Sequence, residues 1–120
     1  MGHIFADIVL RGTRKEKALK KVIVDTGATY TIMPTEVVEE VGAIRTPWRV
    51  ELMLGNKKRV KAVVYVAQIE IKGRKGPMRI ASFKDAVPAI GVDTLESLGL
   101  RADALKGKLE PVRGDYALYV

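Results

Sequence analysis

The sequence contains no cysteine and a single histidine, His3, near the N-terminus. Without cysteine the chain can form neither disulfides nor thiolate metal sites. Because the one histidine lies at the terminus, we expect no Ser-His-Asp triad, no histidine-rich zinc site and no H-E-x-x-H helix. If the protein performs hydrolytic chemistry, carboxylates are the main groups left to carry it out.

Long apolar segments are also missing. No uninterrupted apolar run approaches the roughly 18 residues that a membrane-spanning helix needs, and neither end resembles a signal peptide with its basic and apolar regions. The 48% hydrophobic and 29% charged residues are ordinary for a soluble globular protein. We therefore expect a cytoplasmic protein that does not enter a membrane, with residues 1–120 folded as a single domain.

The chain carries a net charge of +7 at pH 7, from 21 lysine and arginine residues against 14 acids. Basic clusters at residues 11–21, 57–61 and 72–75 can bind phosphate groups without sequence specificity. Aromatic residues, however, make up only 6% of the chain and are not interleaved with these clusters, as base stacking would require. Nucleic-acid binding is therefore the less favoured interpretation, and solvated loops are the more favoured one. A third interpretation is that the cluster at residues 57–61 favours acidic substrates.

One stretch, residues 22–29, combines a buried-strand pattern with an acid and a glycine. Its three β-branched residues before the acid predict a strand. Asp25 follows directly, and a carboxylate at such a place is costly to bury unless it is hydrogen-bonded or used in chemistry. The D-T-G triplet alone is compatible with an ordinary strand-to-turn junction in which Asp25 and Thr26 bond nearby amides.

The context of the triplet favours a more specific interpretation. Asp25-Thr26-Gly27-Ala28-Thr29 resembles the active-site motif of the aspartic peptidases, in which two apolar residues precede Asp-Thr/Ser-Gly. Ala89-Ile90-Gly91, followed by a short helical segment, resembles the second element of that family, an apolar pair and a glycine before a helix. With both motifs in this order, residues from roughly 4 to 100 are similar to a retropepsin-like (retroviral-type, single-domain) aspartic peptidase.

This resemblance implies a mainly-β fold, namely a closed acid-protease-like barrel or folded sheet with one or two short helices and one half-site per chain. It implies a homodimeric aspartic endopeptidase in which Asp25 residues of two chains activate a water molecule to hydrolyse peptide or protein substrates. No metal or organic cofactor is expected. A second Asp-Thr pair, at Asp93, lacks the glycine and is interpreted as a helix start instead.

The resemblance also implies roles for individual residues. Asp25, Thr26 and Gly27 are the expected catalytic residues, with Thr26 bracing the two loops across the two-fold axis. The hairpin at residues 50–61 corresponds to the flap that closes over the substrate. The expected substrate-binding residues come from the motif and from the tip of this hairpin: Ala28, Thr29, Leu54, Gly55, Asn56 and Lys57.

Two features depart from the retroviral pattern. Gly55 is the only glycine at the tip of the hairpin, where retroviral flaps have more, and the tip is rich in lysine. The chain also continues beyond residue 100, with strand candidates at residues 108–112 and 116–120. The alternative function is therefore a catalytically weak or silent dimer of the same fold that acts as a peptide- or nucleic-acid-binding module.

Hydrophobic alternation and turn residues predict the remaining elements. We expect a helix at residues 35–41, with Thr35 as its N-cap and Gly42 at its end, and a second helix capped by Asp93. Residues 101–104 are expected to form a loop. The expected strands lie at residues 4–10, 19–24, 30–33, 48–54, 59–72 and 78–83, the last of them after a turn at residues 73–77.

Overall fold

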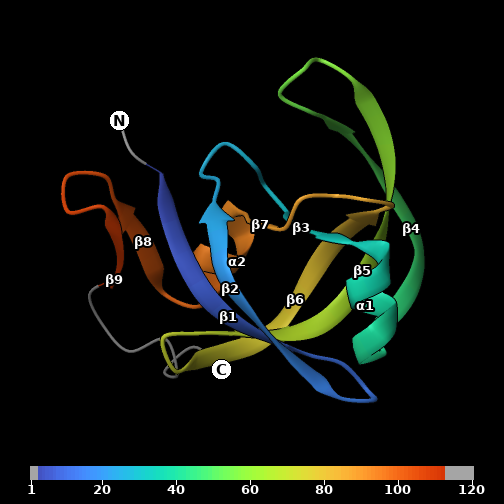
Figure 1. Cartoon of the computed structure of the whole chain (residues 1–120), viewed down its shortest axis with the longest axis horizontal. Helices are drawn as coiled ribbons and strands as arrows, with labels where there is room; N and C mark the ends of the chain where they lie inside the picture. The colour runs from blue at the N-terminus through green and yellow to red at the C-terminus, as the bar shows by residue number, and fades with distance from the viewer. Residues whose placement is uncertain (1–2, 113–120) are drawn as a thin grey trace.

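The computed structural model describes residues 3–112, which form nine strands and two short helices (Figure 1). The elements are, in chain order, β1 (Ile4–Arg11), β2 (Glu16–Val24), β3 (Thr31–Pro34), α1 (Thr35–Val41), β4 (Ile44–Met53), β5 (Arg59–Ile71), β6 (Arg74–Phe83), β7 (Ala89–Ile90), α2 (Val92–Ser97), β8 (Leu100–Asp103) and β9 (Lys108–Pro111). Among these residues, neither helix is long and apolar enough to cross a membrane. The expected mainly-β fold with short helices is confirmed.

Most of the strands are joined in one ring. The hydrogen-bonded order is β1-β2-β7-β3-β6-β5-β4, and β1 also pairs with β5, so that six strands form the ring and β4 lies outside it. β5 connects the two parts because residues 59–66 pair with β4 and residues 68–71 pair with β1. Figure 1 shows the consequence: the β4–β5 hairpin, in green, extends away from the ring.

The interior of the ring is filled by aliphatic side chains. Leu10, Ile69, Ile80 and Ile90 are fully buried and come from four different strands of the ring, so these strands share one core. Isoleucine is favoured at such positions because its branched side chain packs well on a pleated surface. Burying each of these side chains stabilises the fold by about 1.5–3 kcal/mol. The strand ends that carry the site are thus anchored in a common core.

Several strands begin earlier than the sequence predicts. β6 begins at Arg74 instead of residue 78, because the turn before it has only two residues, Lys72 and Gly73, with φ of +53° and +77°. Pro77 is tolerated inside β6 because β3 pairs with β6 only at residues 80–83, so no strand on that side needs the missing N–H. β2 and β4 also extend into polar residues, where pairing with a neighbouring strand replaces hydrophobic alternation as the cause of extended structure.

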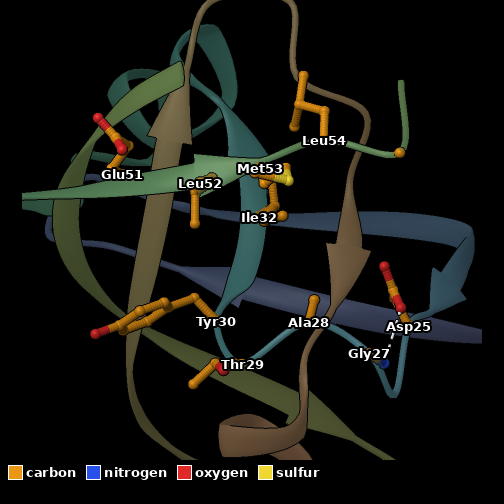
Figure 2. A pocket seen from close by; sticks show the side chains of 11 residues that line it. Asp25, Gly27, Ala28, Thr29, Tyr30, Ile32, Glu51, Leu52, Met53 and Leu54 are labelled. Atoms are coloured by element: carbon orange, nitrogen blue, oxygen red, sulfur yellow. Dashed lines mark hydrogen bonds between the residues drawn. The ribbon is translucent and has the colours of Figure 1, made fainter. Parts of the chain in front are cut away.

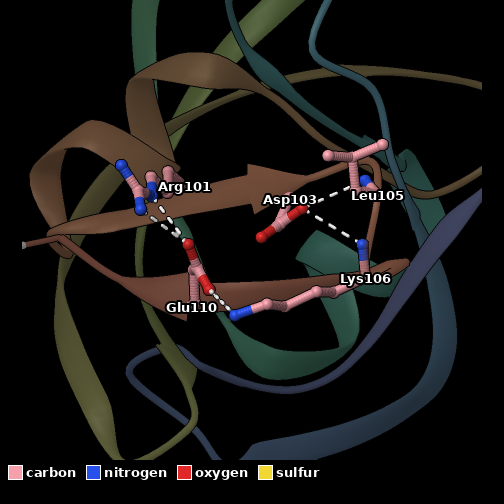
Figure 3. Close-up of polar contacts among 5 residues, drawn as sticks. All are labelled: Arg101, Asp103, Leu105, Lys106 and Glu110. Carbon is pink, nitrogen blue, oxygen red and sulfur yellow. Dashed lines mark hydrogen bonds and ion pairs between the residues drawn. The ribbon is translucent and has the colours of Figure 1, made fainter.

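A second correction concerns the residues after α2. They were expected to form a loop, but Leu100–Asp103 forms strand β8, which pairs with β9 in a separate two-stranded sheet. Arg101 and Glu110 form an ion pair across the two strands at 2.7 Å, and Asp103 accepts two backbone hydrogen bonds within the turn (Figure 3). β9 confirms the expected strand at its position, whereas the strand expected at residues 116–120 lies outside the described residues.

Both helices begin without the side-chain caps that the sequence predicts. The N-cap of α1 is Pro34 instead of Thr35, whose hydroxyl accepts a hydrogen bond from β6. The N-cap of α2 is Gly91, and Asp93 lies in the first turn, where its carboxylate pairs with Arg79 at 2.7 Å. In both helices, the side chain expected to cap the helix, the Thr35 hydroxyl or the Asp93 carboxylate, instead contacts a residue of β6.

β7 brings together two segments that are distant in the sequence. It is parallel to β2, pairing Ala89 with Ile23, and antiparallel to β3, pairing Ala89 with Ile32. The chain then continues through Gly91 into α2 and passes against the loop that joins β2 to β3. A Cβ on Gly91 would lie 2.4 Å from the carbonyl carbon and oxygen of Tyr30, so only glycine permits this approach.

Two buried hydroxyls complete this crossing. Thr31 Oγ1 accepts a hydrogen bond from the Gly91 N–H at 3.1 Å and lies 2.7 Å from Thr94 Oγ1. Both threonines are fully buried, where an unpaired polar group is costly. The Thr31 hydroxyl therefore ties β3 to both the residue after β7 and the first turns of α2.

Removing the Thr31 hydroxyl tests this junction. We expect Thr31→Val to lower the free energy of unfolding by about 1–3 kcal/mol, because the Gly91 N–H and the Thr94 hydroxyl lose their buried partner. Chemical denaturation measures this change. The double variant Thr31→Val/Thr94→Val is expected to lose less than the sum of the two single changes, since no threonine hydroxyl is then left unpaired. Additive losses would contradict a shared hydrogen-bond network.

The close approach at Gly91 gives a second prediction. Its φ of −95° suits any residue, so the effect of Gly91→Ala is steric, and we expect a loss of roughly 1–3 kcal/mol in the free energy of unfolding. Gly55→Ala is the matched control, because a Cβ at that position meets nothing within 4 Å. Thermal unfolding of both variants against the wild type is the measurement, and equal melting temperatures for the two would disprove the tight contact.

Candidate active site

The turn after β2 presents the Asp25 carboxylate at the surface. The Asp25 N–H donates to the Ile90 carbonyl at 2.9 Å, and the Ala28 N–H donates to the Asp25 carbonyl at 3.1 Å. These bonds fix the backbone on both sides of the acidic residue. The side chain is exposed, and its Oδ1 accepts a hydrogen bond from the Gly27 N–H at 3.0 Å. Asp25 therefore has a fixed backbone and a carboxylate that solvent can reach.

Gly27 leaves room for the Asp25 carboxylate. Its φ is outside the left-handed region, so the backbone conformation alone does not demand glycine. A Cβ at this position would lie 3.3 Å from Asp25 Oδ1, which is tighter than an ordinary van der Waals contact. Glycine thus lets the carboxylate fold back onto the Gly27 N–H without being displaced.

The first turn of α2 holds the other half of the loop. The Val92 N–H donates to the Ala28 carbonyl at 2.8 Å, and the Asp93 N–H donates to the Thr29 carbonyl at 3.0 Å. The first N–H groups of a helix have no partner within the helix, so they are available for such bonds. The D-T-G motif and the glycine-helix motif therefore form a single structural unit.

A pocket of about 360 Å³ lies between this loop and the β4–β5 hairpin (Figure 2). Its lining comes from both segments: Asp25, Gly27, Ala28, Thr29, Tyr30, Ile32, Glu51, Leu52, Met53, Leu54 and Gly55. In Figure 2, Asp25 lies at one end, and Leu52 points from the hairpin toward the loop. Glu51 points the opposite way, as expected for its neighbour in a strand.

The structure brings most of the expected site residues together. Asp25, Gly27, Ala28 and Thr29 line the pocket from the loop, and Leu54 and Gly55 line it from the hairpin. The other three expected residues, Thr26, Asn56 and Lys57, are exposed and do not line it.

The two hairpin residues among these three stabilise the turn itself. The Asn56 side chain accepts a hydrogen bond from the Lys58 N–H at 2.9 Å, and the Lys57 N–H donates to the Leu54 carbonyl at 2.8 Å. Lys57 also has a positive φ of 67°, which a turn requires. The tip of the hairpin therefore extends past the pocket of this chain.

Five lining residues were not expected from the sequence: Tyr30, Ile32, Glu51, Leu52 and Met53. A signal for some of them was present. Ala28, Tyr30 and Ile32 alternate along the chain, and side chains at alternate positions of an extended segment share one face. Glu51, Leu52 and Met53 are consecutive, so alternation does not select them, and their place beside the pocket depends on how the hairpin lies over the loop.

The chemistry that this site can support follows from its charged groups. Among the described residues, no group of three or more potential ligands could hold a metal ion. The exposed Asp25 carboxylate can accept a proton or a hydrogen bond from a water molecule. Asp93, in the other Asp-Thr pair, does not line the pocket and is paired with Arg79. One chain therefore presents one catalytically suitable Asp-Thr-Gly carboxylate.

Comparison with known proteins agrees with this geometry. The chain matches the family model for aspartyl protease over residues 12–92, a range that contains the Asp25 loop, the β4–β5 hairpin and Gly91. No curated protein matches the chain. Because the family match covers more than half of the chain and includes every residue that lines the pocket, the chain belongs to the aspartyl protease family.

Proposed function

We propose that this protein is a retropepsin-like aspartic endopeptidase that works as a homodimer. The observation that carries the proposal is the exposed Asp25 carboxylate, which a hydrogen-bonded loop holds at one end of a pocket. The aspartyl protease family match supports the hydrolysis of peptide bonds. The homodimer follows from the number of carboxylates that this chemistry needs.

Peptide hydrolysis by carboxylates requires two of them close together. The ionised group takes a proton from water, while the protonated group donates a hydrogen bond to the substrate carbonyl. Two carboxylates that lie within a few ångströms of each other share one proton, because two negative charges at such a short distance cannot both be kept at modest cost in free energy. An isologous two-fold interface brings the same surface of two chains face to face and thus supplies a second Asp25.

The proposed reaction needs only water and the two carboxylates. The water oxygen attacks the carbonyl carbon, and its proton passes to the ionised Asp25. The tetrahedral intermediate then collapses, the carbon–nitrogen bond breaks, and the leaving nitrogen takes up a proton from the dyad. Thr26, exposed next to Asp25, would hydrogen-bond across the two-fold axis and brace the two loops. The Gly27 carbonyl would accept a hydrogen bond from the substrate backbone.

The β4–β5 hairpin would act as the flap over the bound peptide. Leu52 points from the hairpin toward the loop, and it lines the pocket together with Ala28, Ile32 and Leu54. This apolar surface suits an uncharged substrate side chain, and its closure would exclude water from the reacting bond.

Replacing the catalytic acid is the direct test. We expect Asp25→Asn to lower the rate of cleavage of an unfolded protein by roughly 10²–10⁴-fold, because a neutral amide cannot take a proton from water. Cleavage would be followed between about pH 3 and 7. We expect pepstatin, an inhibitor of aspartic peptidases, to abolish cleavage by the wild type. The matched control is Asp93→Asn, which changes the other Asp-Thr pair and is expected to retain cleavage. Equal activity of wild type and Asp25→Asn would refute the mechanism.

Mixing the two forms tests the homodimer. When wild-type and Asp25→Asn chains are co-expressed, mixed dimers contain one functional carboxylate, so activity is expected to fall more steeply than the wild-type fraction. The mass in solution, from light scattering, is measured on the same samples. A monomer with full activity would rule out the shared site. A dimer that binds peptide without cleaving it would support the peptide-binding alternative.

A further inference from the structure

The β4–β5 hairpin has two chemically different faces. The register pairs Leu52 with Val60 and Val50 with Ala62, and these side chains are partly or fully buried. The intervening pairs place their side chains on the opposite face, because successive residues of a strand alternate. Figure 2 shows this directly, with Leu52 pointing toward the loop and Glu51 pointing away from it.

The outward face is strongly basic. It is formed by Arg49, Glu51, Met53, Arg59 and Lys61, and the adjoining turn adds Lys57 and Lys58. We call this set of seven residues the cationic face. All seven are exposed, and they comprise five cations and a single acid.

The ion pairs of the cationic face leave it positive. Its one acid, Glu51, pairs with Arg59 at 3.2 Å. Within the described residues, Arg49, Lys58 and Lys61 form no ion pair.

Elsewhere in the protein the cations more often have acidic partners. Lys15 and Lys17 both pair with Glu40, and the carboxylate pKa of Glu40 is lowered by these hydrogen bonds. Arg79 and Arg101 are paired in the same way, each at 2.7 Å. The excess of positive charge is therefore concentrated on the hairpin that covers the pocket, and local stability does not explain it, since neighbouring like charges repel.

We propose that the cationic face recruits protein substrates through acidic residues that flank the bond to be cleaved. The inference rests on the proposed peptidase function and names its substrate class. Glu51 and Met53 of the cationic face also line the pocket, so residues that flank a peptide segment held there would emerge close to this face. Charges attract over about 8 Å at physiological ionic strength, so flanking acids need not contact a particular lysine.

A polypeptide fits these observations better than a nucleic acid does. The pocket beneath the hairpin offers the apolar side chains of Ala28, Ile32 and Leu52, which suit a peptide side chain. None of the seven residues of the cationic face is aromatic, and Trp48, which is exposed next to Arg49, is a single ring and not a series interleaved with the cations. Single-stranded nucleic acids are usually bound by alternating cations and aromatic rings.

The test uses two peptides with the same central apolar segment, one with Asp and Glu in its flanks and one with Ser and Gln. We expect kcat/KM to be about tenfold higher for the acidic-flanked peptide at low ionic strength. The difference should shrink as salt rises from about 50 to 500 mM, because salt screens the attraction. Equal kcat/KM values at low salt would overturn the proposal and leave Asp25-dependent cleavage intact.

Two triple variants distinguish the effect of the cationic face on substrate preference from the effect of the net charge of the whole protein. Arg49→Gln/Lys58→Gln/Lys61→Gln is expected to lose the acidic preference and to retain the wild-type rate on the neutral peptide. The matched control, Lys20→Gln/Lys72→Gln/Lys108→Gln, removes the same charge from β2, the β5–β6 turn and β9. Figure 1 shows the β5–β6 turn and β9 on the other side of the molecule from the hairpin. If both variants lose the preference equally, the cationic face is not responsible.

Binding keeps the inference testable if no cleavage occurs, which would count against the proposed peptidase function. Fluorescence anisotropy of the labelled peptides would then compare wild type with the two triple variants. Tighter binding of the acidic-flanked peptide, lost only in the hairpin variant, would support recruitment of acidic polypeptides. A labelled single-stranded oligonucleotide that binds through these cations, while the acidic peptide does not bind, would overturn the proposal in favour of nucleic-acid binding.

Discussion

The buried hydroxyl of Thr31 is the contact on which the geometry of the site depends most. The aliphatic core stabilises the ring of strands, but apolar packing is non-directional and does not by itself set the position of a loop. The Thr31 hydroxyl bonds the Gly91 N–H and Thr94 together inside the protein. That junction positions the start of α2, whose N–H groups hold the carbonyls of Ala28 and Thr29. Together with the hydrogen bond from the Asp25 N–H to the Ile90 carbonyl, these bonds position the backbone that carries the Asp25 carboxylate.

The parts of the fold that the sequence predicted are those with local causes. The strand before Asp25, the helix at α1 ending at Gly42 with φ of +75°, and the β4–β5 turn all follow from hydrophobic alternation or from residues with special backbone freedom. The errors have tertiary causes. β8 is held by pairing with β9 and by the Arg101–Glu110 ion pair, and the helix caps are replaced by contacts with β6 and Arg79. Hydrophobic alternation and capping motifs span only a few residues, so they do not indicate partners that are distant in the sequence.

The residues of the candidate site also fall into two groups, those that local sequence signals predict and those whose position depends on the tertiary structure. The motif residues of the loop were predictable because a D-T-G sequence after a β-branched strand is itself a local signal. The residues that the hairpin adds to the pocket depend on how far β4 and β5 extend and how they lie over the loop. The sequence shows a basic cluster at residues 57–61, but not that Arg59 and Lys61 lie opposite Met53 and Glu51, on the face away from Leu52. Only the strand register separates an apolar inner face from a charged outer one.

The shared strand β5 has a mechanical consequence. It begins in the hairpin and ends in the ring, where residues 63–71 pair with β6 and residues 68–71 also pair with β1, so the base of the hairpin is part of the ring. A displacement of the tip therefore acts on the ring through β5. The pairing of β4 with β5 is interrupted between Arg45 and Arg49. Because no ladder pair joins β4 to β5 there, we expect the hairpin to bend most easily around Pro47, and residues 51–55, which line the pocket with Asp25, lie beyond this point toward the tip.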